Sequence, residues 1–324
     1  MKSFFFLRGV QALKHGLNHL NLKKNDHLLV PSFICDVVVE EMKFFGIKPI
    51  YYNINSRFEA DWRDIKKNYS KNIKGIVMIH FFGVPQKVIK YYNFCKKNNI
   101  YLIEDNCHGF NGLKSLGQIG KYSDIAITSP SKIIKEIDNG GILFVKKGKK
   151  SKIKNYVSLL RYKKNIYHKT KNKIKKIKFI KKLYRSIFNR PDYEDINISK
   201  INKSFDLRLD KYTENNIKNF SFKKEKALRI SRFNLWKNTL NKFNVKPYFE
   251  YKDSDNYILW YFVAKVENYH VRKKFYDWGW KNNIDIVSWP SFPKDFKKNN
   301  LTFKFSRKFI LFPLNQNFKN IDLL

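Results

Sequence analysis

The chain has 324 residues and a mass of 39.0 kDa, which is enough for one large core or for one large and one small domain. Hydrophobic residues make up 43% of the sequence and aromatic residues 17%, which excludes an intrinsically disordered protein. The net charge of +39 at pH 7 favours anionic partners, but Lys greatly outnumbers Arg, whereas nucleic-acid surfaces favour the planar guanidinium of Arg.

In the first half of the chain, short apolar runs alternate with amphipathic runs. The apolar runs predict strands at residues 27–30, 48–52, 73–80, 100–103, 123–128 and 141–145. The amphipathic runs predict helices at residues 9–20, 36–45 and 86–98. Helices between buried strands are typical of βαβ units, so we predict an α/β fold with a mainly parallel sheet. Ligands of such sheets bind at the C-terminal ends of the strands.

The middle of the chain, residues 146–190, is dense in Lys and Arg and has no acidic residue. Ile174, Ile177, Ile180 and Leu183 recur at helical spacing, which indicates one or two basic amphipathic helices. We favour helices that pack on the core with their charges outward. The alternative is a surface for substrate phosphate or for weak contact with an anionic membrane.

The last third of the chain predicts a smaller α/β domain. Its predicted parts are a long helical stretch at 216–243, a strand at 257–266, a helix at 271–282, a Pro-rich turn at 288–293 and an apolar run at 309–314. We therefore divide the chain into a large domain, a basic helical segment and a small C-terminal domain, at residues 1–150, 151–195 and 196–324.

The cysteines and histidines limit the classes of protein to which the chain can belong. Cys35, Cys95 and Cys107 form no paired framework, which predicts a reducing, cytoplasmic location. The seven histidines have no Cys partner at metal-ligand spacing, so we predict no metal site. The apolar patch at Met1–Leu7 is too short for a signal peptide or a membrane span, and no other run reaches spanning length.

Two segments carry candidate chemistry at predicted strand ends. The run from Ile103 to His108 contains Asp105, whose carboxylate at the tip of a buried strand needs a cationic partner or caps the next helix. Lys132 follows another predicted strand and precedes Gly140 and Gly141. A lysine in a desolvated pocket adds to aldehydes, whereas a surface lysine is the simpler interpretation of this segment alone.

A third segment predicts a phosphate site. Gly9 opens a predicted helix, and the free N–H groups of a first helical turn attract phosphate. Ser129 and Ser131 offer hydroxyl groups for the same purpose.

Together these segments resemble fold-type I enzymes that use pyridoxal 5'-phosphate (PLP), and more closely the DegT/DnrJ/EryC1/StrS family of sugar aminotransferases. The resemblance covers roughly the first 145 residues and runs through residues 28–33, 46–50, 79–85, 103–105, 117–124 and 132–141. It implies a large domain with a mainly parallel seven-stranded sheet.

The resemblance also implies roles for single residues. Lys132 is the implied catalytic residue, which binds PLP covalently and moves a proton between cofactor and substrate carbons. Asp105 binds the pyridine nitrogen, and His108 lies against the ring. The remaining implied cofactor-binding residues are Gly9, Val10 and Ser129. Val10 departs from the family, which usually has a hydroxyl there, and so does Cys35, near which many members place an aromatic residue.

The function implied is PLP-dependent transamination of a nucleotide-linked keto-sugar in a cytoplasmic homodimer. An amino acid, glutamate by expectation, is the donor, and the product feeds polysaccharide or amino-sugar biosynthesis. Lys132 argues against the dehydratase branch of the family, in which His replaces this lysine. One alternative is a catalytically inactive binding or scaffold protein, motivated by Val10 and Cys35. The other is a nucleic-acid-binding protein, which the charge alone motivates and no recognised motif supports.

Overall fold

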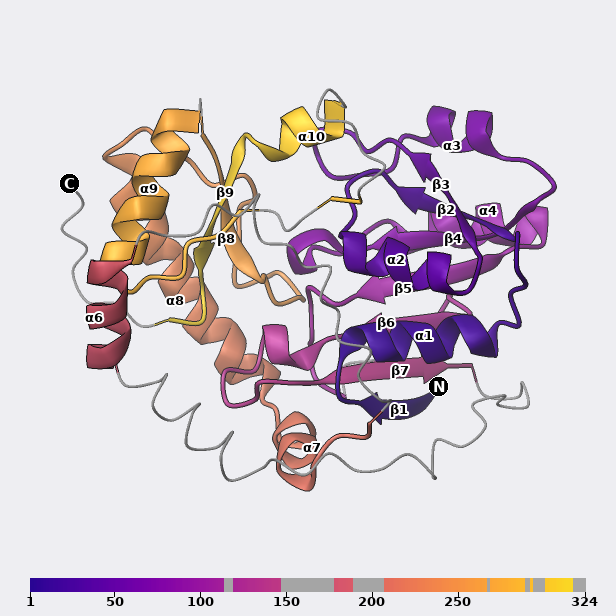
Figure 1. Cartoon of the computed structure of the whole chain (residues 1–324), viewed down its shortest axis with the longest axis horizontal. Coiled ribbons are helices and arrows are strands. Elements are labelled where there is room, and N and C mark those ends of the chain that lie inside the picture. Colours follow the sequence, from indigo (N-terminus) through magenta and orange to yellow (C-terminus); the bar gives the residue numbers. More distant parts are fainter. Residues whose placement is uncertain are drawn as a thin grey trace.

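The computed structural model describes residues 1–113, 119–146, 178–188, 207–266, 269–288, 292–293 and 301–316. These residues form two sheets with helices around them, a large sheet on one side of the molecule and a small sheet on the other (Figure 1). Most of the predicted basic segment at 151–195 lies outside the described residues, and the proposed domain boundaries stay a prediction.

The large sheet confirms the predicted mainly parallel, seven-stranded architecture. Its order is β1-β7-β6-β5-β4-β2-β3, and β7 runs in the direction opposite to the other six described strands. The strands are β1 (Lys2–Phe6), β2 (His27–Pro31), β3 (Lys48–Tyr52), β4 (Ile73–Ile79), β5 (Tyr101–Asn106), β6 (Ile125–Thr128) and β7 (Gly141–Val145).

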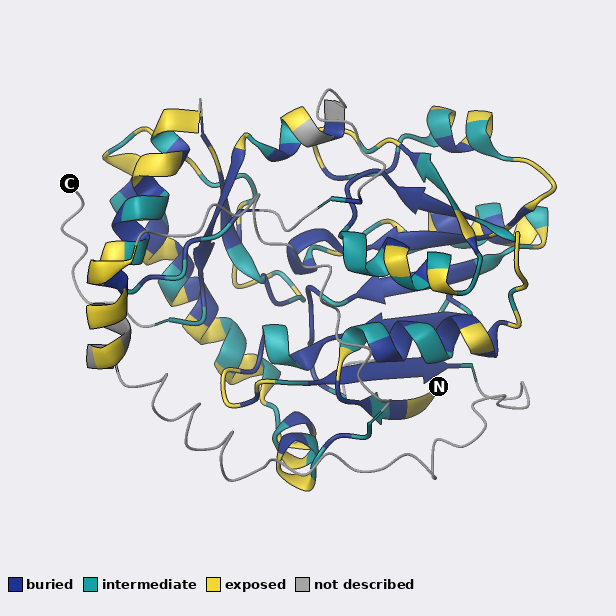
Figure 2. Cartoon of the chain, viewed as in Figure 1, coloured by how far each residue is buried: buried dark blue, intermediate teal, exposed yellow. Residues whose placement is uncertain are grey.

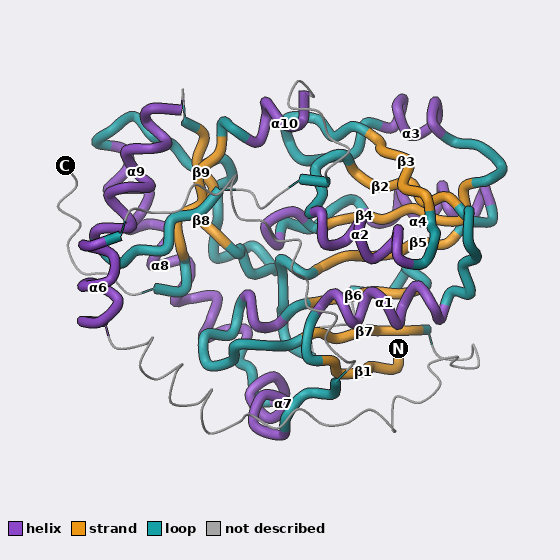
Figure 3. The backbone as a smooth tube through the Cα atoms, viewed as in Figure 1, coloured by secondary structure: helices purple, strands orange, loops and turns teal. Residues whose placement is uncertain are grey.

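Helices cover both faces of this sheet because the strands are apolar on both sides. Successive side chains of a strand point to opposite faces, so Leu28 and Val30 pack in one cluster and Leu29 in another. The helices α1 (Gly9–His19) and α2 (Asp36–Phe44) cover the first face, as Figures 1 and 3 show. The helices α3 (Trp62–Asn68) and α4 (Val88–Asn98) contribute Ile65, Tyr91 and Cys95 to the cluster on the second face.

The small sheet pairs β8 (Tyr261–Lys265) with β9 (Phe309–Pro313) in antiparallel register. The helix α8 (Phe222–Asn241) packs against it through Trp236, whose ring centroid lies 4.7 Å from that of Phe312. The other described helices of the second half of the chain are α6 (Lys178–Ile187), α7 (Lys211–Lys218), α9 (Tyr269–Lys281) and α10 (Leu301–Ser306).

The structure differs from the expected elements at three places in the two sheets and their helices. The predicted helical stretch at 216–243 is two helices, because Ser221 caps a new helix by accepting the N–H of Lys224 after α7 has ended. The apolar patch at Met1–Leu7 contains β1, which the sequence analysis did not identify as a strand. β5 continues to Asn106, beyond the predicted end at residue 103, because it pairs with β4 and β6 on both sides.

The helix α6 confirms that the basic stretch contains a helix, but its expected orientation was wrong. Arg185 is buried, whereas Ile180, Leu183 and Ile187 are exposed, so the described apolar side chains face outward (Figure 2). Within the described part of the chain, no helix is both long and apolar enough to cross a bilayer.

Candidate active site

A cavity of about 450 Å³ lies where the strand ends of the large sheet, the start of α1 and the small sheet meet. All six predicted site residues line it: Gly9, Val10, Asp105, His108, Ser129 and Lys132. The small sheet and its approaches contribute Trp260, Tyr261, Val287, Ser288 and Leu311. Residues that are far apart in the sequence thus meet in one cavity of a size typical for small-molecule sites.

Asp105 forms part of the cavity floor. Its strand register places it between Ile79 of β4 and Ile127 of β6, and both of these apolar side chains line the same cavity. Asp105 is 6% exposed, and its Oδ1 accepts the N–H of Cys107 at 2.8 Å. The thiol of Cys107 also contacts this carboxylate. A buried carboxylate that lines a cavity suits a cationic or N–H-bearing ligand.

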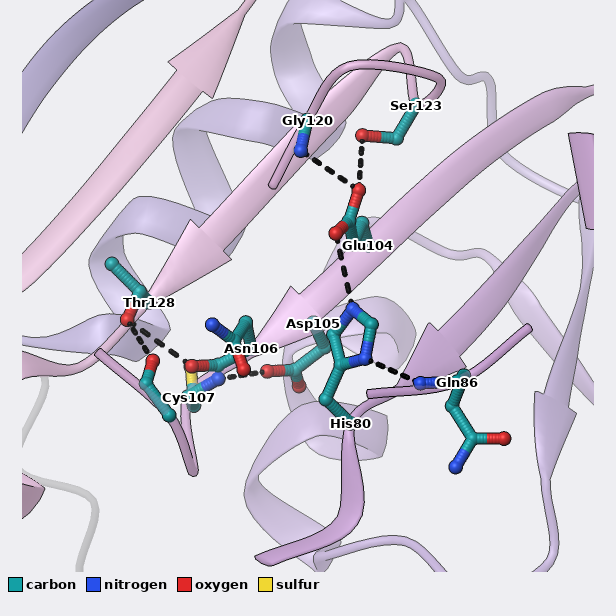
Figure 4. Close-up of polar contacts among 10 residues, drawn as sticks. His80, Gln86, Glu104, Asp105, Asn106, Cys107, Gly120, Ser123 and Thr128 are labelled. Atoms are coloured by element: carbon teal, nitrogen blue, oxygen red, sulfur yellow. Dashed lines mark hydrogen bonds and ion pairs between the residues drawn. The ribbon is translucent and has the colours of Figure 1, made fainter. Parts of the chain in front are cut away.

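The neighbouring carboxylate, Glu104, faces the other side of the sheet and anchors this strand end (Figure 4). Its Oε2 accepts hydrogen bonds from Gly120 N and Ser123 Oγ, both at 2.9 Å. Its Oε1 lies 3.0 Å from Nε2 of His80, whose Nδ1 accepts the N–H of Gln86 at 2.9 Å. Because Nδ1 is an acceptor, Nε2 carries the proton and donates to Glu104. This network holds the backbone of Asp105 in place.

Lys132 ends a short 3-10 turn, η2 (Pro130–Lys132), directly after β6. The turn is held by the N–H of Lys132, which donates to the Ser129 carbonyl at 3.0 Å. Ile133 and Ile134 after it are buried, so the lysine is fixed at the cavity wall. Its Nζ lies 4.5 Å from the ring centroid of Trp260, within the range of a cation–π contact.

His108 packs against the same indole ring. The ring centroids of His108 and Trp260 are 4.4 Å apart with an interplanar angle of 23°. Phe82 connects the two residues, because its N–H donates to Nδ1 of His108 and its carbonyl accepts the N–H of Trp260. Burial, together with the nearby positive charge of Lys132, holds the pKa of His108 well below its usual value of 6.5. His108 is therefore a neutral ring at physiological pH.

The start of α1 forms the end wall of the cavity. Its first N–H groups, on Gly9 and Val10, have no partner within the helix, and both residues line the cavity. Gly141 makes this arrangement possible, because a Cβ there would lie 2.2 Å from the carbonyl oxygen of Arg8. Ser129 reaches the same region, but its hydroxyl donates to the Gly140 carbonyl at 3.1 Å. The hydroxyl oxygen of Ser129 can therefore still accept a hydrogen bond, whereas its proton is already donated to Gly140.

Two thiols, Cys35 and Cys107, line the cavity between the charged residues. Burial raises the pKa of Cys35 to about 12, while the charge of Lys132 lowers it and that of Asp105 raises it. The pKa of Cys107 is also raised, mainly by burial. The charges of Asp105 and Lys132 both act on these two half-buried thiols, and all four residues line one cavity.

Sequence analysis missed Arg229, which is fully buried in α8. Its guanidinium donates to the carbonyls of Leu259, Trp260 and Ile133 at 2.8–3.0 Å, and its Nε bonds Glu225 at 2.7 Å. Arg229 thereby ties the turn that carries Lys132 to the segment that carries Trp260. An Arg in a Lys-rich helix was the available signal, because Arg is preferred for buried, multiply bonded sites.

Comparisons with known proteins identify the family of the chain. A model of the DegT/DnrJ/EryC1/StrS aminotransferase family matches residues 6–177, more than half of the chain. UDP-N-acetyl-3-dehydro-alpha-D-glucosamine 3-aminotransferase of Acidithiobacillus ferrooxidans is 27% identical over 139 residues, which are 42% of this chain and 37% of that protein. GDP-perosamine synthase of Escherichia coli O157:H7 is 25% identical over 122 residues, or 37% of this chain and 34% of that protein. The matches thus span about a third of the length of these curated relatives.

Solved structures show the fold over nearly the whole chain. NtdA from Bacillus subtilis, with bound cofactor PMP, superposes with a TM-score of 0.64 at 16% identity, covering 97% of this chain and 68% of that one. An aminotransferase from Psychrobacter cryohalolentis gives a TM-score of 0.63 at 13% identity, covering 96% of this chain and 82% of that one. The large sheet and its covering helices are therefore the fold-type I architecture. With its match to the family model over residues 6–177, the chain belongs to the DegT/DnrJ/EryC1/StrS aminotransferase family.

Proposed function

We propose that the protein is a PLP-dependent aminotransferase that transfers an amino group from an amino acid to a nucleotide-linked keto-sugar. The observation that carries the proposal is that Lys132, Asp105 and the start of α1 line one cavity. These are the groups that sequence analysis assigned to the aldehyde, the pyridine nitrogen and the phosphate of the cofactor.

The residues of the cavity fit this cofactor chemically. Asp105 offers an acceptor to a protonated ring nitrogen, and the first N–H groups of α1 offer donors to a phosphate. Val10 supplies only its backbone N–H to that phosphate, since its side chain has no hydroxyl. His108 and Trp260 stack on each other in the lining of the same cavity. When bound, PLP supplies an electron sink for the carbon that loses its proton.

The side chains of the chain then have separate tasks. Lys132 holds the cofactor by its amine and, once released, moves the proton between carbons of cofactor and substrate at Nζ. Asp105 keeps the ring nitrogen protonated, and the neutral His108 packs beside the ring without adding a charge. Arg229 keeps Lys132 and Trp260 at a fixed separation through its carbonyl contacts. The wall of the small sheet excludes water from the reacting carbon.

Several features support a sugar nucleotide as substrate. The relatives from Acidithiobacillus ferrooxidans and Escherichia coli carry UDP- and GDP-sugar names. The exposed residue Arg8 is among those that line the cavity, and its guanidinium is a cation of the kind that binds a diphosphate. Glutamate as donor, a role in polysaccharide or amino-sugar biosynthesis, a cytoplasmic location and a homodimer complete the proposal by analogy with the family.

The visible absorbance spectrum of the purified protein tests the proposal. With PLP we expect a band on the order of 400–430 nm, which glutamate removes as the amino group is transferred. Borohydride reduction fixes the cofactor to Lys132, and mass spectrometry of the peptide locates it. Lys132→Ala abolishes this label, while Lys135→Ala, at an exposed position three residues on, serves as the matched control.

The same measurement also distinguishes an active aminotransferase from an inactive scaffold protein. A well-folded protein that shows no cofactor band at saturating PLP is a scaffold protein, and the aminotransferase proposal is then wrong. A band that glutamate leaves unchanged, and that other amino acids remove, overturns only the choice of donor.

A further inference from the structure

A second cavity, of about 580 Å³, lies on the face of the large sheet opposite the active-site cavity. The strand β5 separates the two cavities, because successive side chains of a strand point to opposite faces. Asp105 lines the active-site cavity, whereas Glu104 and Asn106 line the second cavity. Figure 4 shows Glu104 in contact with His80, which lines the second cavity as well. The volume is in the range of sites that bind small molecules.

The buried part of the second cavity is polar. His80, Glu104 and Asn106 are only 4%, 1% and 4% exposed. Both ring nitrogens of His80 and both carboxylate oxygens of Glu104 are engaged in the network that anchors β5. The side-chain amide of Asn106, by contrast, forms no hydrogen bond with any residue that the structure describes. Burying such a group without a partner costs free energy, so this amide suits a ligand group that donates and accepts hydrogen bonds.

The exposed part of the second cavity carries positive charge. Lys87 and Lys121 line it, and Lys87 also forms an ion pair with Glu59 at 2.9 Å. Lys121 has no acidic partner in the described part of the chain, and its ammonium lies 5.3 Å from the ring centroid of Tyr122 in the same lining. The helix α4 begins here, with its second residue Ile89 at the cavity. An unpaired ammonium beside a helix N-terminus favours an anion, above all a phosphate.

We infer that the second cavity binds a phosphorylated sugar, with the phosphate at Lys121 and the start of α4 and a sugar hydroxyl at Asn106. Three further carboxamides line the same cavity, those of Gln86, Asn111 and Asn256. Carboxamides match sugar hydroxyl groups, because both kinds of group donate and accept hydrogen bonds. The inference does not depend on the proposed enzymatic function, because none of these residues lines the active-site cavity.

Isothermal titration calorimetry tests the inference on the full chain, loaded with PLP and desalted, with glucose 1-phosphate as the probe. We expect a dissociation constant on the order of 1 mM. Lys121→Ala should weaken binding about tenfold, since it removes a charge-assisted hydrogen bond. Asn106→Leu replaces the amide by an apolar group of similar size and should weaken binding about fivefold. Lys97→Ala, at an exposed position of α4 away from the cavity, is the matched control and should change binding by less than about twofold.

Several results would overturn the inference. Absence of binding up to roughly 50 mM probe excludes the site. Inorganic phosphate that binds as tightly as the probe leaves an anion site without sugar recognition, and glucose that binds as tightly removes the role of the charge. A Lys121→Ala variant with unchanged affinity shows that the probe binds elsewhere.

The active-site cavity is the competing location for the probe, and PLP loading separates the two. Binding that occurs before PLP loading and disappears after it places the probe in the active-site cavity, which contradicts the inference but not the aminotransferase proposal. A protein that shows no cofactor band and still binds the probe through Lys121 contradicts the aminotransferase proposal alone. Circular dichroism checks that each variant is folded.

Discussion

The ammonium nitrogen of Lys132 lies 4.5 Å from the ring centroid of Trp260, although 128 residues separate them in the sequence. Lys132 follows a strand of the large sheet, and Trp260 directly precedes a strand of the small sheet. The cavity is therefore shaped by how the two sheets are held together, and several measurable consequences follow from individual contacts.

The indole ring of Trp260 should contribute to the affinity for PLP. Trp260→Ala removes the surface that contacts both Lys132 and His108, and we expect the affinity for PLP to fall roughly tenfold, as losing one cation–π and one stacking contact implies. Trp260→Phe keeps a smaller ring and should retain most of the affinity. Titration of the visible band measures both, and equal affinities of the Ala and Phe variants would contradict the role of the ring.

Arg229 should be important for stability as well as for the cavity. Arg229→Met leaves Glu225 and three buried carbonyls without their donor, so we expect the free energy of unfolding to fall by roughly 3–5 kcal/mol. Arg232→Met is the control, one turn further along α8, since this partly exposed side chain donates to the carbonyl of Leu314. Its loss should cost about 1 kcal/mol. Urea denaturation measures both values. Similar losses of unfolding free energy in the two variants would contradict the structural role of Arg229.

The stability of the protein should depend on pH through His108. Its pKa is lowered in the folded state, so between that value and the ordinary 6.5 the unfolded chain binds a proton that the folded chain does not. The contribution of His108 to the free energy of unfolding therefore does not change with pH above about pH 6.5. Below that pH the contribution decreases, by at most about 1.4 kcal/mol per pH unit. His108→Gln should remove this component. Urea denaturation between pH 5 and 8 tests it, and identical pH profiles of the two proteins would refute it.

Cys35 should be chemically inert although it lines the cavity. Its pKa of about 12, against 9.0 for an ordinary thiol, lowers the thiolate fraction near pH 8 about a thousandfold. Iodoacetamide labelling followed by mass spectrometry should be slow in the folded protein and fast in urea. Lys132→Ala should slow it further, because the lysine charge favours the thiolate. Labelling of the folded protein at the unfolded rate would show that the thiol is not desolvated.

The sequence predicted the parts of the site that depend on local order. Asp105 and Lys132 follow apolar runs that pair with the next strand, so their places at the sheet edge follow from the βαβ pattern. The predicted end of the strand near Asp105 was too early, because the polar residues at 104–106 suggest a loop. The pairing of β5 with both neighbouring strands keeps these residues extended.

The contributions of the second half of the chain could not be predicted in this way. Trp260 lies in an apolar run that also suits a core strand, and Arg229 resembles any other cation of a basic helix. Their roles arise from packing between segments about a hundred residues apart, as the bond from Arg229 to the carbonyl of Ile133 shows. The orientation of α6 was missed for the same reason, since Trp280 and Asp285 determine it.

The pairing of β1 with β7 has a consequence for how the protein is made. Phe4 and Phe6 of β1 lie opposite Leu143 and Gly141 of β7. On the ribosome, β1 therefore emerges long before its only partner strand within the described sheet, and it presents apolar side chains and an open edge during that interval. The yield of native protein should therefore depend on translation speed and on chaperone supply in the expression host.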